Sequence, residues 1–316
     1  MVRSLALAAS LLCAAGWAQA QAENYPTRPI SVVIPFTAGG ASDVIGRYLG
    51  ERLSKTLGQP MVVENKPGAS GSIAVMAVKN APADGYTVLL ASSSPAAVNP
   101  AIMKDLPYDI DKDLKPVSGL TRVMNMFVVP AASPFRTLQD LVDASTKGRD
   151  LSVGTYSEGY RLAVAWFGML SGGSFTNIPY KGGSQMFADL MGGQLDWAFA
   201  DVAGVSPLVR SGQLRALAVT GDSRHENFPD IPTVRESGYE DYVNYAWTSY
   251  YVRSETPDAI VRKLEKAVHE VLASDDAAAF AKRTEASLMP LPPAEMRKLQ
   301  VEETNRYRRI QAAAND

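Results

Sequence analysis

The sequence has few of the side chains on which enzymes and metal sites commonly rely. Among 316 residues there are one cysteine, Cys13, and two histidines, His225 and His269. Cys13 falls in a segment that we expect to be removed, so the mature chain would have no disulfide, no thiol nucleophile and no cysteine metal site. We therefore expect neither a metal nor a cofactor, and a fold held together by its hydrophobic core alone.

The first twenty residues have the composition of a secretory signal peptide. Arg3 supplies the positive charge, residues 5–15 form a short apolar run, and residues 18–20 are a typical Ala-Gln-Ala cleavage site. The run is too short to cross a bilayer comfortably, and Leu12 precedes Cys13 where a lipoprotein signal needs a small residue. We expect cleavage after residue 20 and a periplasmic location.

Strong charge, long apolar runs and nucleotide-binding motifs are also lacking. The formal net charge is −2, whereas proteins that bind nucleic acid carry basic patches. Beyond the signal peptide no segment is long and apolar enough for a membrane span. The sequence contains no G-x-G-x-x-G, G-x-x-x-x-G-K-[ST] or H-E-x-x-H motif. These absences argue against nucleic acid as a partner and exclude the commonest nucleotide and zinc-protease motifs.

What is present begins with a strand, a turn and a helix. Ile30–Phe36 is a short β-branched and apolar run, typical of a buried strand. A small-residue turn, Thr37–Ala41, follows, and apolar residues then recur at helical spacing from Ser42 until Gly58. Such a turn aims backbone N–H groups and partial positive charge at one point, which favours an anion. The alternative is an ordinary connection with Ser42 as the N-cap.

Strands and helices alternate from there on, which predicts mostly parallel sheets flanked by helices. The extended passage Leu114–Pro130 separates two such series and indicates two α/β lobes. The expected strands are residues 60–64, 86–91, 151–154, 175–180, 195–200 and 214–220; the expected helices are residues 72–80, 137–146, 159–170, 184–191, 257–274, 276–285 and 293–312. We expect lobe 1 to hold residues 21–124, lobe 2 residues 125–224, and lobe 1 again residues 225–316, with the second crossing near 214–225.

The second lobe repeats the opening arrangement. Its first strand ends in the loop Thr155–Arg161, with Ser157 as the expected N-cap, and its third strand ends at Asp201. Ligands of parallel sheets bind outside the carboxyl ends of the strands. If the two lobes face each other, helix N-termini from both would hold an anionic ligand, a carboxylate or phosphate, by backbone donors.

Several motifs, taken together and in order, resemble one known family. They are Tyr25–Asp43 (YPTRPISVVIPFTAGGASD), Val63–Ala69 (VENKPGA), Pro179–Gly182 (PYKG), Asp189–Gln194 (DLMGGQ), Leu214–Thr220 (LRALAVT) and Pro232–Gly238 (PTVRESG). The sequence is similar to the Bug family, the extracytoplasmic solute receptors of tripartite tricarboxylate transporters, over nearly the whole chain after the signal peptide. The resemblance implies a two-lobe periplasmic-binding-protein fold, type II-like, that closes on a small carboxylate. It implies no cofactor, and delivery to a large and a small integral-membrane subunit. We expect a monomer.

The resemblance also implies ligand-binding residues. On lobe 1 they are the first-strand loop and the acid after it, together with a hydroxyl turn: Phe36, Thr37, Ala38, Gly39, Gly40, Ser42, Asp43, Ser92 and Ser93. On lobe 2 they are the opposing loop and a polar residue that closes the site: Thr155, Tyr156, Ser157, Glu158, Tyr160, Arg161 and Asp201. The family loop contacts one ligand carboxylate through its backbone. Asp43 has a second interpretation, as a favourable charge at a helix N-terminus.

The loop Thr155–Arg161 departs from the family pattern. Many members have a Gly/Ser-rich turn followed by His-Leu, whereas here two tyrosines crowd the loop. One hypothesis is that Arg161 binds a second carboxylate bidentately while Tyr156 or Tyr160 flanks an aromatic or extended ligand. The alternative is an ion pair between Glu158 and Arg161, with the tyrosines packed at the lobe surface.

Two other functions stay open. Acid–base pairs can assemble from distant positions, so a hydrolase is conceivable, although neither histidine is placed beside a plausible nucleophile and Ser157 is not in a G-x-S-x-G motif. The same cleft would also serve a receptor that signals to a membrane sensor kinase. We expect instead a non-enzymatic receptor that works by hinge closure on a dicarboxylate, a tricarboxylate, an acidic amino acid or an aromatic carboxylate.

Overall fold

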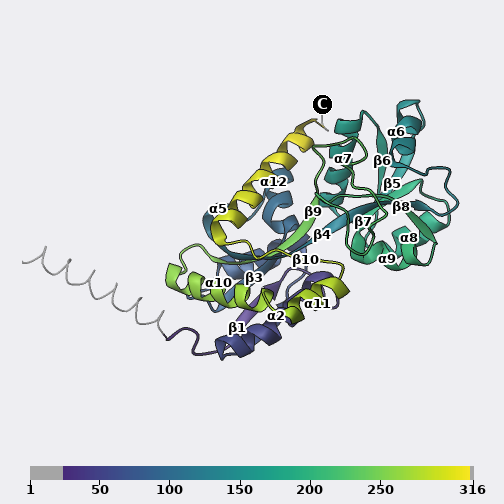
Figure 1. The fold of residues 1–316 in the computed structure, drawn as a ribbon. Helices are drawn as coiled ribbons and strands as arrows, with labels where there is room; N and C mark the ends of the chain where they lie inside the picture. The colour runs from purple at the N-terminus through teal and green to yellow at the C-terminus, as the bar shows by residue number, and fades with distance from the viewer. Residues whose placement is uncertain (1–23, 314–316) are drawn as a thin grey trace, which may run out of the picture. The chain divides into compact units, whose positions relative to one another are not determined.

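The computed structural model describes residues 24–313 as an α/β protein of two compact units (Figure 1). Unit 1 holds the described residues up to Leu120 together with residues 248–277 and 290–300. Unit 2 holds residues 121–247, residues 278–289 and the described residues from Val301 onward. The predicted signal peptide and Cys13 lie outside the described residues.

Unit 1 is built on a sheet in which β1 lies between β2 and β3 and is parallel to both. Its elements are β1 (Ile30–Ile34), α2 (Ala41–Leu57), β2 (Met61–Asn65), the 3₁₀ turn η1 (Ala69–Gly71), α3 (Ser72–Lys79), β3 (Thr87–Ser92), the π-helical turn η2 (Ser94–Val98), α4 (Asn99–Ile102), α5 (Ile110–Asp113) and α10 (Asp258–Leu272). Ile34 is in register with Asn65, so the carboxyl ends of β1 and β2 are neighbours. The loops that follow these strands therefore share one edge of the sheet.

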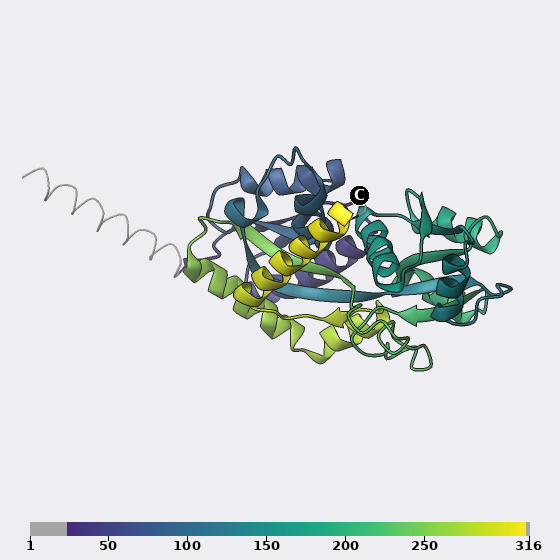
Figure 2. The same cartoon turned by 90° about the horizontal axis from the view of Figure 1, so that it is seen from above.

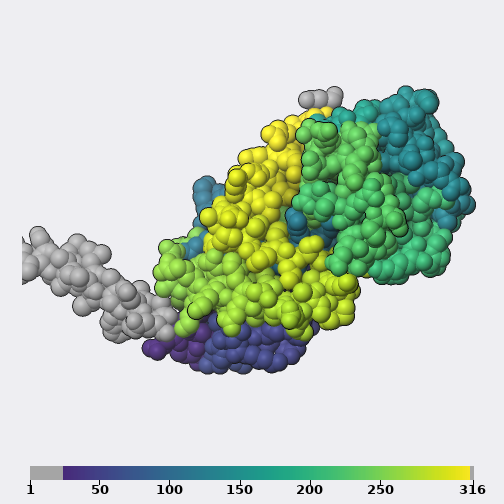
Figure 3. Space-filling model, in the orientation of Figure 1, coloured from purple at the N-terminus to yellow at the C-terminus, as the bar shows by residue number. Residues whose placement is uncertain are grey.

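The core of unit 1 explains why these segments adopt their structures. The β-branched side chains of β1 are buried, and α2 turns one stripe, including Ile45, Leu49 and Leu53, inward. Helix α2 ends at Gly58, whose φ of 71° is the left-handed conformation that glycine adopts without strain. Helix α10 packs on α2, and its exposed residues include Arg262 and Lys266. The helix lies at the surface seen in Figure 3.

Unit 2 is a second sheet, in which β5 lies between β6 and β7 and is parallel to both. Its elements are α6 (Leu138–Thr146), β5 (Leu151–Thr155), α7 (Glu158–Ser171), β6 (Phe175–Pro179), α8 (Gly183–Met191), β7 (Trp197–Asp201), α9 (Val202–Arg210), β8 (Leu214–Val219) and β10 (Ser287–Leu288). An aromatic cluster forms much of its core, with Phe127 stacked on Trp197 and edge-on to Phe167. A set of rigid strands and helices thus supports the loops after β5 and β7.

Four elements contain residues of both units. They are β4 (Leu114–Pro130), the long strand seen in Figure 2, β9 (Tyr245–Arg253), α11 (Asp275–Arg283) and α12 (Pro293–Ala313). In unit 2, β4 pairs antiparallel with β7, β8 and β10. In unit 1, β9 pairs antiparallel with β3. The chain therefore passes between the units along continuous secondary structure.

The chain divides at residues that differ from those expected. The first passage lies at Leu120, close to the expected residue 124, but β8 belongs wholly to unit 2 and the second passage lies in β9, at Trp247. β9 is not among the strands that the sequence predicts, because buried polar residues such as Thr248 and Ser249 interrupt its apolar pattern. Ser249 is satisfied there by donating its hydroxyl to the carbonyl of Ser118, at 2.8 Å.

Candidate functional site

The loop between β1 and α2 is largely exposed. The predicted residues Thr37, Ala38 and Gly39 are exposed, and Phe36 and Gly40 are half-buried. The N-cap of α2 is Gly40, which offers no side-chain acceptor to the first turn. The N–H groups of that turn have no partner inside the helix, so they are donors available to an anion. The suggestion that Ser42 is the N-cap is wrong: Ser42 lies inside the first turn and is buried.

Asp43 holds this loop in shape. Its carboxylate accepts hydrogen bonds from the Gly39 amide at 2.9 Å, from Arg47 Nε at 2.9 Å and from Asn65 Nδ2 at 3.0 Å. Asn65 Nδ2 also donates to the carbonyl of Phe36, at 3.0 Å. The hydrogen bond from Arg47, followed by that from Gly39, lowers the pKa of Asp43 to about 2. Asp43 is therefore ionised at neutral pH, and its hydrogen bonds hold the turn in place.

The loops after β2 and β3 converge on the same place. Gly71, at φ 92°, is so close to its neighbours that an added Cβ would lie 3.1 Å from Pro35 and 3.3 Å from Pro95. Ala69 and Ser70 have positive φ values of 46° and 54°, a conformation that L-residues rarely adopt. The loop Gly68–Gly71 is not among the predicted site residues, although the motif Val63–Ala69 that leads into it carries the family resemblance.

The predicted hydroxyl turn lies at the end of β3. Ser92 is the last residue of the strand, and Ser93 precedes the π-helical turn η2. Both are half-buried, and Ser92 Oγ accepts a hydrogen bond from the Ser94 amide at 3.3 Å. Single π turns are often found at functional sites. In unit 1, then, the predicted residues from β1, α2 and β3 lie on neighbouring loops.

In unit 2 the equivalent loop joins β5 to α7, and here the predicted N-cap is confirmed. Ser157 Oγ accepts a hydrogen bond from the Tyr160 amide at 3.2 Å. Thr155 is buried, and its hydroxyl donates to Asn177 Oδ1 at 2.7 Å. Thr155 thus ties the end of β5 to the middle of β6.

Two tyrosines of this loop meet Asp201, the last residue of β7. The hydroxyl of Tyr156 donates a short hydrogen bond to Asp201 Oδ2, and that of Tyr160 lies 3.4 Å from the same oxygen. The rings of Tyr156 and Tyr160 pack edge to face, with their centroids 5.0 Å apart. Burial, and then the negative charge of Asp201, raise the pKa of Tyr156 well above its ordinary value. All three residues are half-buried, and a contact between the tyrosines and a ligand stays a prediction.

Arg161 is engaged within its own unit. Arg161 Nε donates to Glu158 at 2.7 Å, and a terminal nitrogen donates to Gln311 at 2.9 Å. The ion pair between Glu158 and Arg161 that we considered as an alternative is therefore present. A contact between Arg161 and a ligand stays a prediction.

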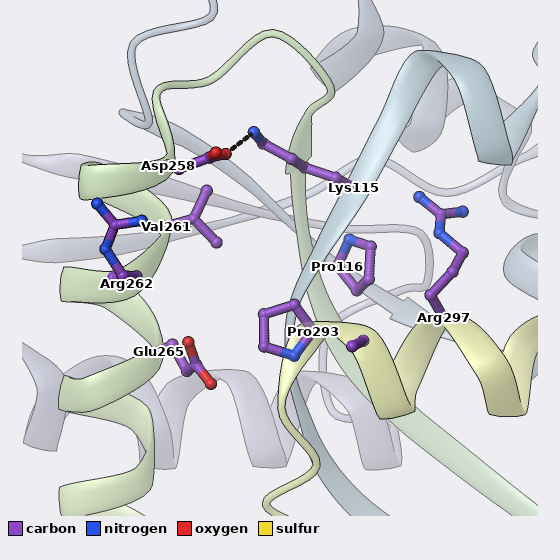
Figure 4. Close-up of a pocket in the computed structure, with 9 residues that line it drawn as sticks. Lys115, Pro116, Asp258, Val261, Arg262, Glu265, Pro293 and Arg297 are labelled. Atoms are coloured by element: carbon purple, nitrogen blue, oxygen red, sulfur yellow. Dashed lines mark hydrogen bonds and ion pairs between the residues drawn. The ribbon is translucent and has the colours of Figure 1, made fainter.

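One pocket of unit 1 contains none of the predicted residues. It has a volume of about 350 Å³ and lies between the start of β4, α10 and the start of α12 (Figure 4). Two of the lining cations form ion pairs: Lys115 with Asp258, at 2.7 Å, and Arg297 with Asp111, at 2.6 Å. Arg262 lines the pocket as well, together with the carboxylates Asp258 and Glu265, so charges of both signs surround this pocket.

Each of the two histidines lies beside a polar side chain of its own unit. We expected neither to lie beside a plausible nucleophile, but His269 Nε2 is 3.1 Å from Ser118 Oγ. Ser118 is completely buried and its hydroxyl donates to the Gly119 carbonyl, at 2.7 Å, so it cannot meet a substrate from solvent. His225 is buried beside Glu285, at 3.8 Å.

Within residues 24–313 no group of three or more His, Cys, Asp or Glu side chains is arranged to hold a metal ion. In the same residues, no helix combines the length and the apolar character needed to cross a membrane.

Curated relatives resemble the chain over most of its length. BugT of Bordetella pertussis is 35% identical over 280 residues, which cover 87% of this chain and 86% of that protein. A UPF0065 protein of Bordetella bronchiseptica is 39% identical over 239 residues, covering 75% and 71% of the two chains.

Solved structures show the same relationship in three dimensions. Rpa4515 of R. palustris, solved with adipate, is 30% identical with a TM-score of 0.81, covering 92% of this chain and 99% of that one. MatC of Rhodopseudomonas palustris, with bound malate, is 29% identical with a TM-score of 0.77, covering 90% and 99%. The periplasmic binding protein BugD is 28% identical with a TM-score of 0.77, covering 92% and 99%.

The fold and the family follow from these findings. The solved neighbours are periplasmic binding proteins, so the predicted two-lobe α/β fold is confirmed, as is the resemblance to the Bug proteins. The family model described as "Tripartite tricarboxylate transporter family receptor" matches residues 45–315. The chain belongs to the receptor family of the tripartite tricarboxylate transporters.

Proposed function

We propose that this protein is a periplasmic receptor that binds a small organic carboxylate and delivers it to a tripartite membrane transporter. Membership of the receptor family supports the role, and two relatives were solved with carboxylates, adipate and malate. The transporter partners are a large and a small integral-membrane subunit. The receptor is a monomer, exported by the predicted signal peptide, and has no enzymatic activity.

The observation that carries this proposal is the unblocked N-terminus of α2. Gly40 leaves the first-turn amides without a side-chain acceptor, and the loop before them is exposed. Asp43 and Asn65 hold the backbone of this loop by hydrogen bonds, so the loop needs little further ordering when a ligand binds. A carboxylate is a good partner here, because charge-assisted hydrogen bonds from backbone N–H groups are stronger than neutral ones.

In unit 1, a ligand carboxylate binds to the backbone of residues 37–42, with Ser92 and Ser93 beside it. In unit 2, the ligand-binding residues are those of the loop Thr155–Arg161, together with Asp201. Contacts that exist only in the closed form favour closure, because a ligand shifts a conformational equilibrium by its difference in affinity for the two states. β4 and β9, which run through both units, are the segments that would bend.

A thermal-shift screen tests the proposal. The purified protein, checked by native mass spectrometry to be free of ligand, is heated with adipate, malate, citrate, glutamate, benzoate, 6-aminohexanoate and 6-hydroxyhexanoate. A ligand that binds only the folded state raises the melting temperature, and 100 Kd of free ligand adds about 2.7 kcal/mol. The matched control for adipate is adipamide, which has the same length but no carboxylate. If no carboxylate shifts the transition, or if adipamide does as well as adipate, the proposal fails.

A further inference from the structure

The group formed by Tyr156, Tyr160 and Asp201, here called the Tyr–Asp cluster, uses its hydrogen-bond donors internally. Both hydroxyl groups point to Asp201 Oδ2, and Asp201 Oδ1 accepts the Gly204 amide at 2.7 Å as the N-cap of α9. Because burial and the nearby carboxylate raise the pKa of both tyrosines well above the ordinary value, the hydroxyl protons stay in place. The groups left to a ligand are lone pairs, which are acceptors.

The Tyr–Asp cluster also holds a carboxylate, that of Asp201, which has no cationic partner among the described residues. Asp43, in unit 1, is paired with Arg47 at 2.9 Å, and Glu158 is paired with Arg161 at 2.7 Å. No lysine, arginine or histidine in residues 24–313 forms an ion pair with Asp201. The N-terminus of α7 beside it is already capped by Ser157 and holds Glu158 in its first turn. A second ligand carboxylate placed here would meet like charge and a blocked helix end.

We propose that the Tyr–Asp cluster binds a hydrogen-bond donor, an ammonium or hydroxyl group, so that the ligand is an amino- or hydroxy-substituted monocarboxylate rather than a dicarboxylate. This inference rests on the proposed function, since the ligand that it describes keeps one carboxylate. An ammonium group gains most, because it both donates to the free lone pairs and neutralises Asp201. Unit 2 therefore recognises the donor group of the ligand.

Isothermal titration with matched ligands tests this assignment. At each chain length from four to six carbons, the dicarboxylate is compared with the ω-amino acid, the ω-hydroxy acid and the unsubstituted monocarboxylate; at six carbons these are adipate, 6-aminohexanoate, 6-hydroxyhexanoate and hexanoate. At the best length we expect the amino or hydroxy acid to bind at least tenfold more tightly than the dicarboxylate. A dicarboxylate that binds as tightly or more tightly overturns the inference but leaves the proposed function intact. If none of the carboxylates binds, both fail.

A substitution assigns the preference to the cluster. Asp201→Asn removes the charge but keeps an N-cap for α9, since asparagine caps as well as aspartate. We expect the preference for the donor-bearing ligand over the dicarboxylate to fall at least fivefold. The matched control is Asp150→Asn: Asp150 accepts a hydrogen bond from Thr176 Oγ1, at 2.7 Å, and lies before β5, at the other end of that strand from Thr155. Far-UV circular dichroism checks that both variants fold.

Tyr156→Phe is a second, independent test of the assignment. Loss of its hydroxyl frees a lone pair on Asp201, so binding of the ω-amino acid should be kept or strengthened while the dicarboxylate stays weak. Tyr239→Phe, in which an exposed hydroxyl 3.4 Å from Gln139 is removed, is the control. An unchanged preference in Asp201→Asn, or a Tyr156→Phe variant that prefers the dicarboxylate, contradicts the assignment.

Discussion

Two loops at the same topological position differ in what they present to solvent. The loop after β1 and the loop after β5 each connect a central parallel strand to a helix. The first begins its helix with Gly40 and leaves the amides of α2 without a cap, whereas the second begins with Ser157 and caps α7 itself. One loop offers donors and the other, with the Tyr–Asp cluster, offers acceptors. A shared fold position does not therefore imply a shared ligand chemistry.

Removing the carboxylate that supports the first loop should have the largest effect. Asp43→Ala removes a buried carboxylate that accepts hydrogen bonds from the Gly39 amide and from Asn65 Nδ2, and it leaves Asn65 Nδ2 only the Phe36 carbonyl. We expect the free energy of unfolding in urea to fall by about 3 kcal/mol, since each hydrogen bond to a charged group contributes about 1.5–3 kcal/mol. Carboxylate affinity should fall with it. Arg47→Gln, which removes a side chain that is 55% exposed, should cost less than about 1 kcal/mol.

The same carboxylate makes stability depend on pH in a known direction. The pKa of Asp43 is lowered to about 2 in the folded protein, from an ordinary value of 3.8, so the ionised form is favoured by folding. Its contribution is complete above about pH 4 and is lost as the pH falls through the folded value. Asp43→Ala should lack this part of the acid-induced loss, and equal acid sensitivity in the two proteins would show that Asp43 does not hold the loop.

Substitution of Gly71, a glycine between the loops of unit 1, should have the next largest effect. Gly71→Ala places a methyl group 3.1 Å from Pro35 and at a φ of 92°, so it adds a close contact to backbone strain. Gly58→Ala has a φ of 71° with open space around it, so it isolates the strain alone. We expect a loss of about 2 kcal/mol for Gly71→Ala against about 1 kcal/mol for Gly58→Ala in urea unfolding. Only Gly71→Ala should also weaken carboxylate binding; equal affinity in the two variants would separate this loop from the site.

The elements that local signals determine were predictable from the sequence. Ile30–Phe36, the helix that ends at Gly58 and the cap at Ser157 depend on side chains within a few positions of one another, and the structure has all three. The choice of Gly40 over Ser42 as N-cap was missed because both residues suit that position, and only the path of the loop decides between them.

Contacts between distant residues were not predictable in the same way. Asp201 was expected at the site, but its pairing with Tyr156 depends on β5 and β7 lying side by side in the sheet. Likewise, Gly71 is constrained by Pro35 and Pro95, which precede and follow it on other loops. β9 escaped prediction because its polar residues are satisfied by a partner strand, as Ser249 is by Ser118.

The cap that distinguishes the second loop can be removed. Ser157→Ala deletes the acceptor of the Tyr160 amide, and loss of a serine N-cap typically costs about 1 kcal/mol. Ser133→Ala, which deletes a hydroxyl that accepts from Phe135 N at 3.2 Å outside any helix, is a suitable control and should cost less. Urea unfolding followed by circular dichroism measures both. A Ser157→Ala variant as stable as the parent protein would mean that water replaces the cap without loss.

Gly40→Ser would give the loop after β1 the side-chain N-cap that only the loop after β5 has. Its effect on stability should be the smallest. Gly40 has a φ of −78° and an added Cβ would lie an ordinary 3.6 Å from the Thr37 carbonyl, so Gly40→Ser fits and supplies an N-cap hydroxyl. The gain in stability should be only about 0.3 kcal/mol, because glycine is itself a tolerable N-cap. Carboxylate affinity, measured by titration, should nevertheless fall about tenfold, since the hydroxyl competes for the amides that would bind the ligand. Gly182→Ser is the matched control, because Gly182 begins α8 without a side-chain cap and has open space around it. It should gain similar stability and leave affinity unchanged; a Gly40→Ser variant that binds as tightly as the parent would show that the amides of α2 are not the carboxylate site.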